Sequence, residues 1–190
     1  MEPKSDYISQ EEYLQSERQA EFKSEYFQGE VFAMSGASRN HNKLVSNFII
    51  ELGTKLKGKN CNIYPSDLRV HIPATTLYTY PDIVITCGKE DFLDDQLDTL
   101  LNPEILVEVL SPSTEDYDRG RKFGFYRQIP SLKQYILISS DRRHIETFIK
   151  EGDHWVLYEY IKKEGSLALP SINEKLQLVD IYSGVSLTGI

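Results

Sequence analysis

Apolar residues recur at helical spacing between His41 and Lys57. The pattern is that of an amphipathic helix with one face turned inward. Its apolar positions are Leu44, Val45, Phe48, Ile49, Leu52 and Leu56. A shorter helix is predicted earlier in the chain, where Ser9 and Glu12 form a capping-box pattern, and it is expected to end before Glu25.

A third helix is predicted to begin after Ser113 or Thr114, either of which can cap it. Three acidic residues fall in its first turn, where the helix dipole favours negative charge. They are Glu115, Asp116 and Asp118. The helix is expected to end near Pro130, because proline cannot continue a helix.

Several runs of β-branched, aromatic and aliphatic residues predict strands. The runs are EYFQGEVFAMSG, in which Gly29 marks a tight turn or bulge, NIYPSDLRVHI, YPDIVITCG, EILVEVL, KQYILIS, HIETFIK and HWVLYEY. EILVEVL is nearly all apolar and is therefore predicted to be buried on both faces. The segment between Gly88 and Asn102 is expected to be an exposed connection, and the tail LALPSINEKLQLVDIY to add a short strand and a turn of helix.

These elements predict an α/β or α+β domain with a central sheet and helices packed on it. No repeat or linker divides the sequence, so a single domain over residues 1–190 is expected, with 40% hydrophobic and 26% charged residues as in soluble globular proteins. No apolar run approaches the ~20 residues of a membrane span, and Met1 to Ser5 lack the features of a signal peptide. The expected location is the cytoplasm.

Cys61 and Cys87 are too few for a zinc cluster, and in a reducing compartment they are expected to be thiols rather than a disulfide. The net charge of -8 argues against indiscriminate binding of polyanions, although a local site stays open. Basic residues gather in two groups along the sequence, and the group nearer the N-terminus is expected to be a solvated helix face. They are Lys55, Lys57 and Lys59, and then Arg119, Arg121, Lys122 and Arg127.

Two acidic residues stand in apolar strand segments, Asp82 at the head of DIVIT and Glu108 inside ILVEVL. If the strands are neighbours, the carboxylates converge, and they then need a shared proton or a bound cation. Mg²⁺ fits two carboxylates and keeps sites for water and a phosphate oxygen. Lys122 shares a helix face with Asp118 and Tyr126, so its ammonium could reach the carboxylates. From the residues alone, a structural ion pair explains Glu108 equally well.

Three stretches together, YPDIVITCG, ILVEVLSPST and DRGRKFGFYRQIPSLKQYILI, resemble the Uma-type family. This family is classed with endonucleases, as a branch of the PD-(D/E)xK restriction-endonuclease-like superfamily. The resemblance extends over nearly the whole chain, from EYFQGEV through SDLRV to the final strands. It implies a restriction-endonuclease-like core and metal-dependent hydrolysis of DNA, with Mg²⁺, or Mn²⁺ as its substitute. Nucleases of this fold often pair, so the resemblance also implies a homodimer.

The resemblance also implies roles for single residues. Pro81 and Asp82 match the PD element, and Asp82 and Glu108 match the metal ligands. Leu110 stands where the plain motif has lysine, but in families of this kind the lysine has moved to the next helix, which nominates Lys122. Glu25 matches an early acidic position that supports the metal or its water. Asp67 and His41 match further positions whose roles are accessory.

Two other functions compete with the nuclease. The fold could serve as an inactive module that binds nucleic acid or protein, an idea supported by the acidic net charge and by Leu110. It would bind without cleaving and would not need the carboxylates. The weaker alternative is a metal-dependent phosphoesterase that acts on a small nucleotide rather than on a polymer.

Overall fold

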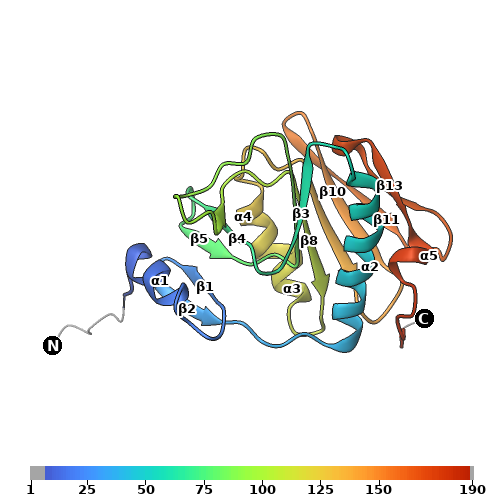
Figure 1. The fold of residues 1–190 in the computed structure, drawn as a ribbon. Coiled ribbons are helices and arrows are strands. Elements are labelled where there is room, and N and C mark those ends of the chain that lie inside the picture. Colours follow the sequence, from blue (N-terminus) through green and yellow to red (C-terminus); the bar gives the residue numbers. More distant parts are fainter. Residues whose placement is uncertain (1–6, 189–190) are drawn as a thin grey trace.

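The computed structural model describes residues 7–188, and the segment from Met1 to Ser5, on which the signal-peptide expectation rests, lies outside them. A six-stranded mixed sheet forms the centre of the molecule (Figure 1). Strands β8 and β9 are parallel, and the other neighbouring pairs are antiparallel. In spatial order the strands are β11 (His154–Tyr160), β10 (Ile145–Glu151), β9 (Gln134–Ser139), β8 (Ile105–Leu110), β6 (Ile83–Cys87) and β3 (Cys61–Pro65).

Two smaller sheets flank this centre. The first has five strands and lies towards the end of the molecule that carries α1 (Figure 1). In spatial order its strands are β2 (Glu30–Ala33), β1 (Ser24–Phe27), β5 (Leu77–Thr79), β4 (Arg69–Ile72) and β7 (Thr99–Leu100). The second pairs β12 (Ser166–Leu169) with β13 (Glu174–Gln177). The chain therefore has the expected α/β architecture with extra C-terminal strands, and it adds a five-stranded sheet.

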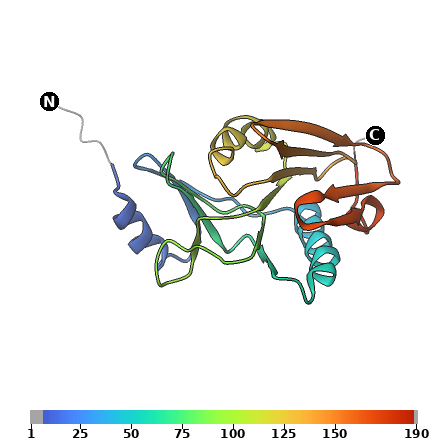
Figure 2. The same ribbon diagram turned by 90° about the horizontal axis from the view of Figure 1, so that it is seen from above.

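Helices cover both faces of the six-stranded sheet, with α2 on one side and the segment around α4 on the other (Figure 2). The helical elements are α1 (Gln10–Glu17), α2 (Arg39–Leu56), α3 (Glu115–Tyr117), the π-helical η1 (Asp118–Lys122), α4 (Phe123–Tyr126), the 3₁₀ turn η2 (Pro170–Ile172) and α5 (Leu178–Ile181). No helix within residues 7–188 is both long enough and apolar enough to cross a membrane.

Strand β8 is buried along its whole length, as its apolar sequence predicts. Side chains alternate across a strand, so Val107 packs in the core beneath α2 while Leu106 and Leu110 pack in the core beneath α4. The same alternation turns Glu108 towards α4. The strand therefore carries one carboxylate into the interior of the protein.

The capping box of Ser9 and Glu12 is present at the start of α1, as predicted. Gly29 lies in the tight turn between β1 and β2 with a φ of 94°, a region that glycine adopts without steric cost. The exposed connection expected between Gly88 and Asn102 is wrong in part. Thr99 and Leu100 form β7 and are buried, because β7 completes the five-stranded sheet beside β4.

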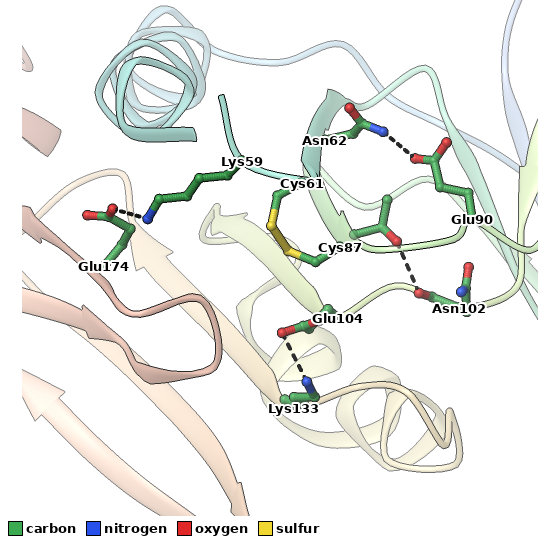
Figure 3. The surroundings of a disulfide bond; sticks show 10 residues. Lys59, Cys61, Asn62, Cys87, Glu90, Asn102, Glu104, Lys133 and Glu174 are labelled. Carbon is green, nitrogen blue, oxygen red and sulfur yellow. Dashed lines mark hydrogen bonds and ion pairs between the residues drawn. A yellow bond between two sulfur atoms is a disulfide. The ribbon is translucent and has the colours of Figure 1, made fainter. Parts of the chain in front are cut away.

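The expectation that Cys61 and Cys87 remain thiols is also wrong, because the structure joins them in a disulfide (Figure 3). Their strands β3 and β6 are antiparallel, and the register places the two cysteines directly opposite each other, with 4.0 Å between their Cα atoms. The sequence separation of 26 residues hid this pairing, since it becomes visible only when the strand register is known.

Candidate active site

Strand β8 brings Glu108 to the centre of the site. Its side chain is buried, and its Oε1 atom accepts a hydrogen bond of 2.7 Å from the Tyr126 hydroxyl. Lys122 Nζ lies 2.8 Å from the same oxygen. Tyr126 ends α4 and Lys122 ends η1, so the helical segment that follows β8 folds back over the carboxylate of its own strand.

Asp82 immediately precedes β6, the antiparallel neighbour of β8. Ile83 pairs with Val107, so continuing the register by one residue places Asp82 opposite Glu108. Asp82 Oδ2 accepts a 2.7 Å hydrogen bond from the backbone N–H of Val109. This bond ties the head of β6 to the end of β8 and fixes the aspartate beside Glu108.

The second contact of Asp82 comes from α2. His41 Nε2 lies 2.9 Å from Asp82 Oδ2, and the helix start is fixed by Ser38, whose hydroxyl accepts a bond from the His41 backbone N–H. His41 Nδ1 is buried and has no hydrogen-bond partner within residues 7–188. The capped first turn of α2 therefore presents the imidazole to Asp82.

Lys122 enters the site from a π-helical segment. The wider turn of η1 lies between the short helices α3 and α4, and such insertions into α-helices occur often at functional sites. The Lys122 side chain is 8% exposed, and its Nζ atom lies 3.5 Å from Glu25 Oε1 and 3.7 Å from Asp118 Oδ1. Together with Glu108, these contacts surround one ammonium with three carboxylates.

Glu25 belongs to β1, within the strand rather than just before it. Its Oε1 atom accepts a hydrogen bond from the Thr79 hydroxyl on β5, the strand next to β1. The five-stranded sheet thus supplies one acidic residue of the site, and the six-stranded sheet supplies Asp82 and Glu108. Lys122 contacts acids from both sheets.

The electrostatic balance of the site is negative. The pKa of Glu108 is raised to about 8, because burial and the charges of Asp82 and Asp118 raise it more than the neighbouring Lys122 lowers it. Burial also raises the pKa of Asp118. Burial lowers the pKa of Lys122, but Glu108 and the other neighbouring acids outweigh it and raise the pKa well above its ordinary value. The Lys122 ammonium is thus shared by several carboxylates, and a bound divalent cation would reduce the repulsion between them.

The donor atoms suit Mg²⁺. Oδ2 of Asp82 and Oε1 of Glu108 make the bonds described above, and the second oxygen of each has no hydrogen-bond partner in the described part of the chain. Two carboxylate oxygens are a common protein contribution to a Mg²⁺ site, because this ion keeps several waters. Asp82 and Glu108 would hold it.

A second group of possible metal ligands lies elsewhere, on β10, β11 and the turn before them. One donor atom each from His144, Glu146 and Glu159 lies within 4.8 Å of the others, and this is the only such group of three or more among residues 7–188. Glu146 is already paired with Arg119 at 2.7 Å, and His144 Nε2 with Glu159 at 3.0 Å. The three residues are separated in the sequence, and the pairing of Glu146 with Glu159 between β10 and β11 brings them together.

Five of the six residues proposed from the sequence are linked by direct contacts or by the Val109 N–H, and Asp67 is not. The Asp67 side chain is 84% exposed and pairs with Lys23 at 2.8 Å. Asp118, Tyr126 and Thr79 were not proposed as site residues. Asp118 and Tyr126 could have been found, because they share the helix face of Lys122.

Comparison with known proteins agrees with this architecture. The sequence model of the Uma2 family, described as "Putative restriction endonuclease", matches residues 10–181. Two uncharacterized proteins of Synechocystis sp. are similar over most of their length. The first, sll1609, is 38% identical over 82% of this chain and 89% of its own, and slr1290 is 39% identical over 94% and 93%.

A solved structure shares the fold. The crystal structure of a protein from Anabaena variabilis, described as "a putative nuclease belonging to DUF820", has a TM-score of 0.75 and covers 93% of this chain and 98% of that chain. The sequence identity is 17%, so this likeness concerns the fold alone. The family match spans most of the sequence, and the chain belongs to the Uma2 family.

Proposed function

We propose that this protein is a metal-dependent endonuclease that hydrolyses phosphodiester bonds in DNA and folds as a single domain. Family membership supports nuclease chemistry, and the convergence of acids around Lys122 supports the location of the site. The observation that carries the proposal is the buried Glu108 carboxylate beside Asp82, because the Lys122 ammonium is shared with Glu25 and Asp118 and the surplus of negative charge favours a further, divalent cation.

Each residue has a separate task in this proposal. Asp82 and Glu108 hold Mg²⁺. The His41 imidazole and the backbone N–H of Val109 fix the orientation of Asp82. When bound, Mg²⁺ would polarise the phosphate and lower the pKa of the attacking water. Lys122 orients that water and offsets the negative charge that develops on the phosphate. Glu25 accepts a hydrogen bond from the water that Lys122 orients.

Cleavage of supercoiled plasmid tests the proposal. The wild-type protein is expected to nick or linearise the plasmid with Mg²⁺ or Mn²⁺ and to lose this activity in EDTA. Glu108→Gln keeps the shape of the side chain, so it should preserve the fold and remove most of the activity. Glu104→Gln is the matched control, because Glu104 is also buried next to β8 but pairs with Lys133 instead. Full activity of Glu108→Gln would refute the site assignment.

The same experiment distinguishes a nuclease from a module that only binds nucleic acid. A protein that binds the plasmid without cutting it, and that binds equally well after Glu108→Gln, would be a nucleic-acid-binding module of the same fold. Cleavage of small phosphodiesters but not of plasmid would favour the nucleotide phosphoesterase.

The proposal includes a homodimer. Each chain carries one site, and a duplex has two strands to cut. Light scattering in solution should give twice the chain mass of 21.9 kDa. A monomer that still linearises the plasmid at low protein concentration would contradict the dimer and leave the nuclease proposal intact.

A further inference from the structure

Arg121 lies against two aromatic rings. Its Cζ atom is 5.1 Å from the ring centroid of Phe27 and 5.6 Å from that of Phe125, and the two rings are themselves 4.9 Å apart. Phe27 belongs to β1 and Phe125 to α4, so the guanidinium contacts two different elements. Arg121 nevertheless remains exposed to solvent. Stacking on aromatic faces restricts an arginine side chain while its N–H groups stay available.

The position of Arg121 follows from the contacts of its neighbour. Lys122 contacts Glu25, and Arg121 contacts Phe27, two residues further along the same strand. Residues i and i+2 of a strand lie on the same face, so consecutive residues of η1 meet consecutive positions on one face of β1. The Arg121 guanidinium therefore lies at the edge of the cluster formed by Lys122 and its acids. Burial raises the pKa of Tyr117, the charge of Glu25 raises it further, and the charges of Lys122 and Arg121 lower it, which agrees with this placement.

Arg121 has no carboxylate partner in the described part of the chain, although the protein has a net charge of -8. Arg119, two residues earlier, pairs with both Glu115 and Glu146. Arg121 packs on rings beside a group of acids that it does not pair with, so the N–H donors of its guanidinium have no partner among residues 7–188. Such an arrangement suits an anion that arrives from solution.

We propose that Arg121 binds a phosphate of the DNA backbone next to the phosphate that is cleaved. This inference rests on the proposed nuclease function and names a substrate contact for the same site. The planar guanidinium can donate two parallel hydrogen bonds to phosphate oxygens, while the rings of Phe27 and Phe125 hold its orientation. Because phosphates carry no sequence information, the contact positions DNA of any sequence.

Steady-state cleavage of plasmid at several salt concentrations tests the inference on Arg121→Gln. Loss of one charge-assisted phosphate contact should raise KM about tenfold and leave kcat nearly unchanged. The slope of log(kcat/KM) against log salt should become shallower by about 0.9, since one fewer counterion is released. Arg121→Lys should restore the salt slope but only part of the KM, because lysine keeps the charge and loses the planar fork.

Arg127→Gln is the matched control. Arg127 is also exposed and its Cζ lies 5.1 Å from the ring centroid of Phe123, a ring that packs on Phe148 of β10 and Trp155 of β11. This variant should match the wild type in KM and salt slope. A wild-type KM and salt slope in Arg121→Gln would refute the phosphate contact while the nuclease stands. Absence of plasmid cleavage by the wild type would refute both proposals.

Discussion

Lys122 Nζ lies 2.8 Å from Glu108 Oε1, yet the lysine comes from a helical segment and not from the strand of the glutamate. In the plain motif the lysine would occupy position 110, two residues after the acid on the same strand face. Leu110 takes that position and is buried in the apolar core beneath α4. The π-helical turn η1 instead places the Lys122 ammonium beside the Glu108 carboxylate.

A double-mutant cycle on this pair tests whether the contact exists in solution. Removing one partner of a buried ion pair leaves the other uncompensated, so Lys122→Met should lower the free energy of unfolding by about 3 kcal/mol. Glu108→Gln combined with Lys122→Met should cost less than the sum of the two single variants. Urea unfolding measures all four proteins. Additive effects would mean that the two side chains do not interact.

The sequence predicted the elements that carry Glu108 and Asp82, because apolar runs interrupted by a carboxylate are visible without a structure. The pairing of Lys122 with Glu25 was not visible, since it joins two sheets through side chains far apart in sequence. The disulfide was missed for a similar reason. Its formation depends on the register of β3 and β6, and the expectation about the cellular compartment pointed the other way.

The lowered pKa of Asp98 leads us to expect that the free energy of unfolding decreases in acid. Burial raises its pKa, but hydrogen bonds from Arg18 and Thr99 and the charge of Arg69 outweigh burial and lower the pKa to about 2. An unfolded aspartate has a pKa of about 3.9, so the stabilisation is complete above that pH and is lost as the pH falls through about 2. The side chain is 33% exposed, which reduces the expected contribution to about 1 kcal/mol.

Urea unfolding of Asp98→Asn checks this prediction. The variant should be less stable than the wild type at neutral pH, and the difference should narrow steadily in acid. Asp95→Asn is the control, because Asp95 is exposed and has no ion pair within the described residues. A difference for Asp98→Asn that stays constant down to the lowest measurable pH would contradict the assigned pKa.

The disulfide between Cys61 and Cys87 is expected to affect the stability of the protein but not its plasmid cleavage. A bridge that closes a loop with a separation of 26 residues should contribute about 3 kcal/mol by restricting the unfolded chain. Cys61→Ser with Cys87→Ser should therefore melt at a lower temperature than the oxidised wild type and at the same temperature as the reduced wild type. Plasmid cleavage should persist, because Cys87 is the last residue of β6 whereas Asp82 precedes the first. An unchanged melting temperature after reduction would show that the bridge does not form.

The central claim is that Asp82 and Glu108 hold the metal ion. Calorimetric titration of Mn²⁺ into the wild type, Asp82→Asn and Glu159→Gln tests it most directly, because Glu159 belongs to the competing group with His144 and Glu146. The account predicts that the wild type and Glu159→Gln bind Mn²⁺ alike and that Asp82→Asn loses the binding heat. Binding that survives in Asp82→Asn and disappears in Glu159→Gln would contradict it.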